Sequence, residues 1–454
     1  MKIDTTDILP VLEAMDSKAR VIIVEAPPGA GKTMLVSVAV AHVVEQGMCP
    51  LFMTISYEQI YGAIARLKQV FPKIQPVVFA SADRKTKDDA KARSLGFTWA
   101  SKWNELAPFV NQNRPVFTVV AKAFSSPLGL EGSEHIFPWI ILDEAFQITD
   151  ADFSINAVLG DRFLMVGDRG QIQPIVKTDI QQWRNDDIGP HLSAPEAIMK
   201  REHLGEDRVK IPMTMSRRLP QRSVDLVQRI FYPTLPFTGS EEKRELNSPD
   251  TVLSNITQEI LARSCGSGAP GFIPVLLPGA GRKDATDISA LEHMAQLTDF
   301  ICQNRLTIIT GNKEREATPE DIVLLVTRNN ERRWLQQRLA TWPGVTIATA
   351  NKFQGSERPV VLALHPLSGK TRASDFDLES GRLCVMLSRH THACFVFHRE
   401  GISELLERKI PNSARALGSE IDHAFTGWLA HRTFMAWIEN SGHRIIFKNP
   451  ELVV

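Results

Sequence analysis

The segment from Val21 to Thr33, which reads VIIVEAPPGAGKT, most constrains what this chain can fold into. An apolar run that predicts a buried strand gives way to Pro and Gly, and then to the helical pattern MLVSVAVAHVVEQG. Glycines let the backbone curl, so that successive N–H groups and the helix N-terminus point at one anion. The sequence therefore predicts a phosphate-binding loop between a strand and a helix.

The loop residues have the types that a nucleoside triphosphate requires. Lys32 adds a charge for the β and γ phosphates, and the Thr33 hydroxyl can hold Mg²⁺. Ala26 stands where this pattern often has its first glycine. The alternative is a Gly-rich turn that merely starts a helix, which the preceding strand and the Lys-Thr pair disfavour. We expect a nucleoside triphosphate and Mg²⁺ as cofactors, with the nucleotide contacted by Pro28, Gly29, Ala30, Gly31, Lys32, Thr33 and Met34.

Composition excludes few classes of protein. The chain has 454 residues, of which 43% are hydrophobic, enough for two or three domains. Lys+Arg and Asp+Glu both number 52, which argues against a polybasic tail or a membrane-surface protein but permits a local basic groove. No apolar run approaches a membrane span and the first residues have no apolar core, so we expect a cytoplasmic protein with no membrane partner. The 5 dispersed cysteines suit reduced thiols better than zinc or disulfides.

Strand-like runs alternate with helical patterns along much of the chain. The runs PLFMTIS, PVVFA, PVFTVV, PWIILDE and RFLMVGD predict a mostly parallel, doubly wound sheet in a first domain over residues 1–212. After a polar, turn-rich stretch from about 233 to 270, FIPVLL, DIVLLVTR, VTIATA, PVVLAL and ACFVFH predict a second such sheet in a domain over 213–410. Aromatic and aliphatic residues at helical spacing predict that residues 411–454 form a helical extension packed on the second domain.

A second chemical landmark is IILDEAFQ, a strand that ends in two adjacent carboxylates. Strand carboxyl ends collect at one edge of a doubly wound sheet, so the pair can meet the phosphate loop. There Asp143 can hold Mg²⁺, and Glu144 can orient and deprotonate the attacking water. The alternative is an ordinary surface pair, which a buried strand running into it disfavours. A third strand, RFLMV, ends in Gly167-Asp168-Arg169-Gly170-Gln171, whose alternative is a plain turn.

Taken in order, these motifs resemble those of the superfamily 1 helicases, specifically the 5′-to-3′ branch that includes the nonsense-mediated-decay RNA helicase. The DEAxQ motif is matched by residues 143–147 and the GDxxQ motif by 167–171. Segments 216–219 (SRRL) and 229–232 (RIFY), then 349–357 (TANKFQGSE) and 382–390 (RLCVMLSRH), are similar to the later motifs of that family. The match spans roughly residues 20 to 400.

This resemblance implies two tandem RecA-like domains with an ATP cleft between them, and it implies roles for further residues. Gln171 would join Lys32 and Glu144 in hydrolysis, and Arg218 and Arg389 would be arginines that the second domain supplies to the γ-phosphate. Arg217, Gly355 and Glu357 would contribute to the nucleotide site. Hydrolysis would then require the two sheets to close on the nucleotide, and reopening would move a gripped strand along.

Two positions depart from the family pattern. Asp7 stands where the family usually has a Gln that reads the adenine edge, and an Asp can accept from the adenine amino group but cannot also donate. Arg217 replaces an aromatic that commonly packs on the base, although a guanidinium plane can stack too. Both departures weaken the expectation of strict ATP selectivity. The alternative for Asp7 is a helix cap.

Contacts to nucleic acid are expected from hydroxyls and cations near strand ends. Thr54, Ser56, Lys122 and Thr349 are the candidates for contacts to backbone phosphates. The alternative for Thr54 and Ser56 is that their hydroxyls satisfy a strand end. The aromatic residues Trp99, Trp103 and Phe124 either stack on bases or belong to the core.

The sequence leaves two classes of function open. The first is an ATP-dependent translocase or helicase on single-stranded DNA or RNA; the second is a nucleic-acid-responsive ATPase switch in a larger assembly, with a protein partner. An exposed apolar patch around Trp428, Phe434 and Trp437 would favour the switch. A metabolic kinase fits poorly, since nothing in it explains paired arginines in a second sheet.

Overall fold

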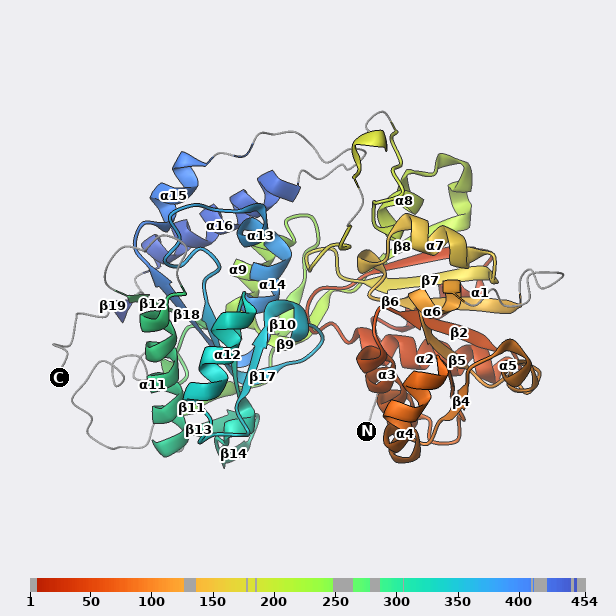
Figure 1. Ribbon diagram of the computed structural model, residues 1–454, viewed down its shortest axis with the longest axis horizontal. Coiled ribbons are helices and arrows are strands. Elements are labelled where there is room, and N and C mark those ends of the chain that lie inside the picture. The colour runs from red at the N-terminus through yellow and green to blue at the C-terminus, as the bar shows by residue number, and fades with distance from the viewer. Residues whose placement is uncertain are drawn as a thin grey trace. The chain divides into compact units, whose positions relative to one another are not determined.

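The computed structural model describes residues 6–125, 136–176, 179–183, 186–247, 264–277, 286–304, 306–409, 411, 423–441 and 445–446 (Figure 1). The chain divides into two compact units. Among the described residues, the first unit holds those up to Arg169 together with Gln173–Thr214, and the second holds Gly170–Ile172 and those from Met215 onward. None of the described helices is both long and apolar enough to span a bilayer.

The first unit is built on an eight-stranded sheet with the order β4-β3-β5-β2-β6-β7-β1-β8, and all its neighbouring strands are parallel. Its strands are β1 (Val21–Glu25), β2 (Pro50–Thr54), β3 (Val77–Phe79), β4 (Thr98–Ala100), β5 (Val116–Val119), β6 (Phe137–Asp143), β7 (Gly160–Gly167) and β8 (Arg208–Pro212). Its helices are α1 (Leu9–Asp16), α2 (Lys32–Glu45), α3 (Tyr57–Val70), α4 (Ala82–Leu95), α5 (Trp103–Val110), α6 (Val120–Ser125), α7 (Asp150–Ala157) and α8 (Ala194–Lys200), with 3₁₀ turns at Ala145–Gln147, Gln181–Trp183 and Glu202–Asp207.

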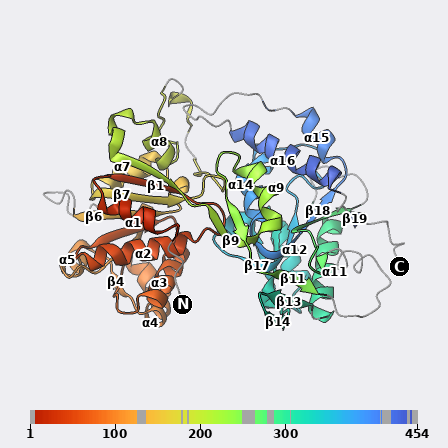
Figure 2. The same ribbon diagram turned by 180° about the vertical axis from the view of Figure 1, so that it is seen from behind.

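Helices cover both faces of this sheet because the buried strands are apolar on both sides. In β1, Ile22 and Val24 face the cluster that α1, α2 and α3 contribute to, whereas Ile23 faces the cluster of α5 to α8. Figure 2 shows α2 and α3 side by side, in agreement with their direct contact. A Ser56 capping box with Gln59 begins α3, which fixes the chain direction after β2.

The second unit has a six-stranded sheet with the order β16-β15-β17-β18-β12-β19, again parallel throughout. A small antiparallel sheet, β11-β13-β14, and a parallel pair, β10-β9, accompany it. Its strands are β9 (Met215–Pro220), β10 (Thr238–Ser240), β11 (Arg244–Asn247), β12 (Phe272–Leu277), β13 (Thr307–Thr310), β14 (Lys313–Glu316), β15 (Ile322–Val326), β16 (Thr346–Thr349), β17 (Arg358–Leu364), β18 (His390–Arg399) and β19 (Ile445–Ile446). Its helices are α9 (Gln221–Phe231), α11 (Ile288–Asn304), α12 (Asn329–Arg338), α13 (Asp375–Leu378), α14 (Ser380–Leu387), α15 (Ile402–Arg408) and α16 (His423–Asn440), with 3₁₀ turns at Pro319–Asp321 and Ala350–Lys352.

The α/β prediction with parallel sheets is confirmed in both units, and the architecture is consistent with two tandem RecA-like domains. Every run predicted as a strand coincides with a strand of a parallel sheet.

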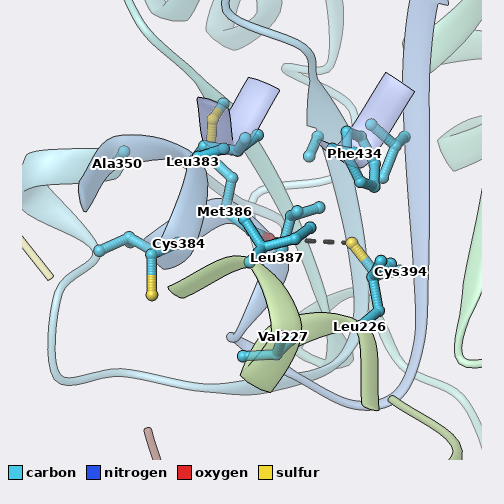
Figure 3. Packing of buried hydrophobic residues seen from close by; sticks show 14 of the residues in the cluster. Leu226, Val227, Ala350, Leu383, Cys384, Met386, Leu387, Cys394 and Phe434 are labelled. Carbon is cyan, nitrogen blue, oxygen red and sulfur yellow. Dashed lines mark hydrogen bonds between the residues drawn. The ribbon is translucent and has the colours of Figure 1, made fainter. Parts of the chain in front are cut away.

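Helix α16 packs into the core of the second unit. It contacts α9, α13, α14 and α15, and Phe434 belongs to the same buried cluster as Leu383 and Met386 of α14 (Figure 3). Trp428 and Phe434 are buried, and Trp437 is partly buried against the same cluster. These residues therefore do not form the exposed apolar patch that would favour a switch subunit.

The close approach of α16 to α13 depends on Gly427. A Cβ built on this glycine would lie 2.1 Å from the backbone oxygen of Leu378, which no side-chain rotation can relieve. We expect Gly427→Ala to lower the free energy of unfolding of this unit by about 1–3 kcal/mol. Gly268→Ala is the matched control, because a Cβ there meets nothing within 4 Å, and it should change stability by less than about 0.5 kcal/mol. Urea unfolding curves measure both; equal midpoints for the two variants would contradict the prediction.

Buried histidines should make the second unit acid-sensitive. Burial lowers the pKa of His390 to about 3 and that of His392 and His431 to about 4, and it lowers the pKa of His365 well below its usual value. The unfolded chain takes up these protons below about pH 6.5 while the folded chain does not, so stability falls as the pH decreases from about 6.5 to 4. At pH 5 His392 and His431 should each cost about 2 kcal/mol.

Thermal melting as a function of pH measures this effect. His431→Gln should flatten the dependence of Tm on pH between 6.5 and 5, whereas the control His203→Gln, at an exposed position, should leave it unchanged. A His431→Gln profile parallel to wild type would show that this histidine does not contribute.

Candidate functional site

The loop after β1 has the backbone of an anion site. Gly29 and Gly31 have φ values of 75° and 97°, a region that side chains disfavour, and Gly31 directly precedes Lys32, the first residue of α2. Helix α2 is 14 residues long, so its N-terminal N–H groups and dipole face the loop. Pro28 and Ala30 are buried, Lys32 and Met34 are partly exposed, and Thr33 is exposed in the first helical turn.

Strand register brings the carboxylates to the same edge of the sheet as the loop. β7 lies between β1 and β6, with Gly167 opposite Glu25 and Val166 opposite Asp143. The Ala26 N–H donates to the Gly167 carbonyl at 2.9 Å. A Cβ on Gly167 would lie 2.8 Å from the Phe146 ring, so only glycine lets the turn after Glu144 approach β7. The prediction that the acidic pair ends a buried strand is confirmed.

Asp143 and Glu144 are both buried, at 7% and 6% exposure. Glu144 has a left-handed φ of 55°; its N–H donates to Asp143 Oδ1 at 3.0 Å, and Gln147 Nε2 donates to Glu144 Oε2 at 3.0 Å. Burial and the neighbouring Glu144 charge raise the pKa of Asp143, while Lys32 opposes that rise.

A desolvated carboxylate pair of this kind is stabilised by a cation. The oxygen donors of Asp143 and Thr33 are the hard ligands that Mg²⁺ prefers, and they fit the predicted metal. In the part of the chain that the structure describes, no group of three or more His, Cys, Asp or Glu side chains gathers as a metal site.

Asp168 belongs to the GDxxQ match of the sequence analysis, which gave this residue no role in the site. Lys32 Nζ lies 3.5 Å from Asp168 Oδ2, and the Asp168 side chain is fully buried. Its position directly after β7 could have identified it, since that strand ends at the same edge as β1 and β6. Lys32 is thus held by a carboxylate close to the loop.

Arg218 lies in the second unit, in β9. Its Nε donates to Glu357 Oε2 at 2.6 Å, and its Nη1 reaches the Ser388 carbonyl at 3.4 Å. The structure therefore brings together two residues that sequence reasoning placed at the nucleotide, Arg218 and Glu357. Arg217 is partly exposed, and Arg244 Nη2 donates to its carbonyl at 2.8 Å. Gly355 is exposed with a φ of 85°.

Arg389 is almost completely buried, at 1% exposure. Its Nη2 donates to Gln171 Oε1 at 2.7 Å, and Gln354 Nε2 donates to the same oxygen at 3.1 Å. These contacts lie within the second unit, to which residues Gly170–Ile172 belong. The structure thus pairs two predicted catalytic residues, Gln171 and Arg389, directly with each other.

The four predicted nucleic-acid contacts have different surroundings. Thr54 is fully buried and its hydroxyl donates to Gln59 Oε1 at 2.9 Å, while Ser56 Oγ accepts from the Gln59 N–H as the cap of α3. Thr54 thus has a local hydrogen bond at the end of β2, as the alternative interpretation supposed, whereas Ser56 caps the following helix. Lys122 lies over the Phe79 ring at 4.7 Å, and Thr349 is 7% exposed at the end of β16.

Most of the remaining candidates, for base reading or stacking, contact other residues of the protein. Asp7 accepts from Thr214 Oγ1 at 3.5 Å and does not cap α1, whose N-cap is Ile8. Trp99 is buried edge-to-face against Phe97, and Trp103 packs on a core cluster. The side chain of Phe124 lies outside the described residues.

Comparisons with known proteins give a relationship but no family assignment. No family model matches the chain. The DNA replication ATP-dependent helicase/nuclease DNA2 of Saccharomyces cerevisiae is 26% identical over 179 residues, which is 39% of this chain and 11% of that protein. The protein of the same description from Gallus gallus is 21% identical over 337 residues, covering 71% of this chain and 32% of its own length. Part of the chain is thus similar in sequence to these two helicase/nucleases.

The chain spans a third or less of the length of these curated relatives. Among solved structures it is similar to arterivirus nonstructural protein 10 (helicase) with DNA, at 15% identity and a TM-score of 0.40, covering 87% of this chain and 65% of that one. It is also similar to the DUF1998 helicase MrfA bound to DNA and AMPPNP, at 12% identity and a TM-score of 0.43, covering 90% of this chain and 51% of that one. Membership of the 5′-to-3′ branch remains a prediction.

Proposed function

We propose that this chain is a nucleic-acid-dependent ATP hydrolase that works as a translocase or helicase on single-stranded DNA or RNA, with 5′-to-3′ polarity and in the cytoplasm. One observation carries the proposal. A glycine-formed anion loop with Lys32 lies at the same sheet edge as the buried pair Asp143 and Glu144. That combination supplies both a phosphate site and the carboxylates for hydrolysis. The related helicase/nucleases are described as ATP-dependent, which supports ATP as the nucleotide.

The residues of the first unit would divide the chemistry as follows. Backbone N–H groups of residues 29–33 hold the phosphates, and Lys32 moves its charge from Asp168 to the β and γ phosphates. Glu144 accepts a proton from the attacking water, and its hydrogen bond from Gln147 orients it. Mg²⁺ held by Thr33 and Asp143 would neutralise charge that develops on the phosphate oxygens.

The second unit would supply cations for the transition state. Arg218 and Arg389 would exchange their present acceptors, Glu357 and Gln171, for oxygens of the γ-phosphate. Each exchange replaces one hydrogen-bonded partner by another, so neither buried guanidinium loses its acceptors. Repeated exchange during hydrolysis would drive the opening and closing that moves a strand.

The switch alternative predicts ATP hydrolysis without strand separation. No observation on the described residues favours it, because the aromatic residues proposed for its patch belong to the core. A protein partner that activates or targets the chain is compatible with either function.

Strand separation on tailed duplexes tests the proposed function. With ATP and Mg²⁺, a duplex carrying a 5′ single-stranded tail should be unwound and one carrying a 3′ tail should not, and Lys32→Ala should unwind neither. Unwinding of the 3′-tailed duplex alone would reverse the polarity. Nucleic-acid-stimulated hydrolysis without separation of either duplex would support the switch.

A further inference from the structure

A cavity of about 730 Å³ lies in the second unit, where β15 ends and α12 begins. None of its lining residues belongs to the candidate nucleotide site. Two segments form its walls, the β15–α12 turn and the stretch from Lys370 to Asp377. The lining residues that carry a charge or an aromatic ring are Arg328, Glu331, Lys370, Arg372, Phe376 and Asp377.

The accessible charge of this cavity is positive. Arg328 is 41% exposed on its side chain, Lys370 is partly exposed and Arg372 is exposed. The carboxylates of the two acidic lining residues already accept hydrogen bonds from neighbouring residues of the second unit. Glu331 is buried and accepts from the N–H groups of Thr327 and Arg328, and Asp377 is buried and accepts from Ser374 and from Arg328 Nη2 at 2.8 Å. Among the described lining residues, an anion that enters therefore meets cations and amides, and both lining carboxylates already have hydrogen-bond donors.

Phe376 presents an aromatic ring at this cavity. It is 42% exposed, although burying a ring of this size is favourable. Arg382 places its guanidinium carbon 3.7 Å from the ring centroid, and its Nη1 donates to the Phe376 carbonyl at 2.6 Å. Arg328 lies over the same ring at 5.4 Å. The ring is thus fixed by two cations and does not depend on a hydrophobic core for its position.

The short helix that carries the ring is also fixed. Ser374 and Asp377 form a capping box at the start of α13, and Lys409 donates to the Ala373 carbonyl. Arg382 further connects this wall to a predicted nucleic-acid contact, because its Nε donates at 3.2 Å to Oδ1 of Asn351, two residues after Thr349. An aromatic ring held rigid beside cations binds planar ligands at low entropic cost.

We propose that Phe376 is a stacking platform for a base of a single nucleic-acid strand, whose adjacent phosphates are held by Arg328, Lys370 and Arg372. This inference rests on the proposed function for the class of ligand, and it adds a base-contacting residue that the motifs do not include. Single-strand binders combine cationic grooves with aromatic side chains in this way, because every base has a face on which a ring can stack.

Binding of a fluorescently labelled oligonucleotide, measured by anisotropy without ATP, tests the platform. Oligo(dT) and oligo(rU) are the two probes, so that DNA and RNA are distinguished. Phe376→Ala should raise Kd by about 5- to 150-fold for the polymer that binds, since base stacking on an aromatic is typically worth that much. Phe376→Trp should bind at least as tightly as wild type. The matched control is Phe425→Ala, which removes another exposed Phe of the second unit, on α16, and should leave Kd unchanged.

Salt dependence separates stacking from phosphate contact. Phe376→Ala should shift log Kd without changing its slope against log salt, whereas Lys370→Ala or Arg372→Ala should reduce that slope by about 1. An oligonucleotide with abasic positions should remove the difference between wild type and Phe376→Ala. Basal ATP hydrolysis without polymer should be unchanged in Phe376→Ala.

The outcomes distinguish a failure of the stacking platform from a failure of the proposed function. Tight binding by wild type with an equal Kd for Phe376→Ala would overturn the platform and leave the helicase proposal standing. A loss of binding that persists with abasic strands would also overturn it, since the ring would then not contact bases. No binding of either polymer by wild type would overturn both.

Discussion

Replacing Glu144 with Gln should lower the rate of ATP hydrolysis by about 10²- to 10⁴-fold, the usual contribution of a general base. Glutamine keeps the shape of the side chain and an acceptor for the Gln147 amide, but it cannot take a proton from water. The substitution also removes one of two adjacent buried charges, so it should not destabilise the fold. Steady-state phosphate release measures the rate, and binding of a fluorescent ATP analogue checks that the nucleotide site remains.

The control for this substitution is Glu13→Gln, at an exposed position of α1. It should hydrolyse ATP at the wild-type rate. Hydrolysis by Glu144→Gln within a few-fold of wild type would show that Glu144 is not the base, and the buried pair would then serve the metal alone.

Replacing Arg389 with Lys should lower hydrolysis by about 10³- to 10⁵-fold, the range for an arginine that stabilises the phosphoryl-transfer transition state. Lysine keeps the charge but loses the planar fork, so it cannot replace Arg389 in donating to an oxygen from a fixed plane. ATP binding should be weakened far less than hydrolysis, because the loop residues of the first unit are unchanged.

Arg315→Lys is the control for replacing an arginine with a lysine. Arg315 lies on the edge strand β14 and forms a bidentate pair with Asp321. It should leave hydrolysis unchanged. Because Arg389 is buried against Gln171, the Tm of Arg389→Lys should be measured alongside. A folded Arg389→Lys protein with wild-type hydrolysis would restrict Arg389 to a structural role in holding Gln171.

The fold was largely predictable because its central strands are apolar on both faces. β1, β6 and β15 are buried along nearly their whole length and appear in the sequence as continuous apolar runs. Strand β8 was missed because Arg208–Pro212 is an edge strand with charged residues and partial exposure. The small sheet β11-β13-β14 was missed for a similar reason, since β14 reads KERE and is exposed throughout.

The parts of the site that could be predicted are those formed by residues close together in sequence. The loop at Gly29–Lys32 and the pair Asp143 and Glu144 are local patterns that a strand–turn context identifies. The pairing of Lys32 with Asp168 and of Arg218 with Glu357 joins residues far apart in sequence, so only tertiary structure reveals it. Phe376 has no motif at all; its exposure and its two arginine neighbours become visible only when the chain is folded.

Stimulation of ATP hydrolysis by single-stranded nucleic acid tests the central claim most directly. Wild-type protein should hydrolyse ATP several-fold faster or more with one of oligo(dT) or oligo(rU) than without polymer, and Lys32→Ala and Glu144→Gln should lose both the basal and the stimulated rate. An equal rate with and without both polymers, with basal hydrolysis intact and lost in the two variants, would contradict an autonomous nucleic-acid motor.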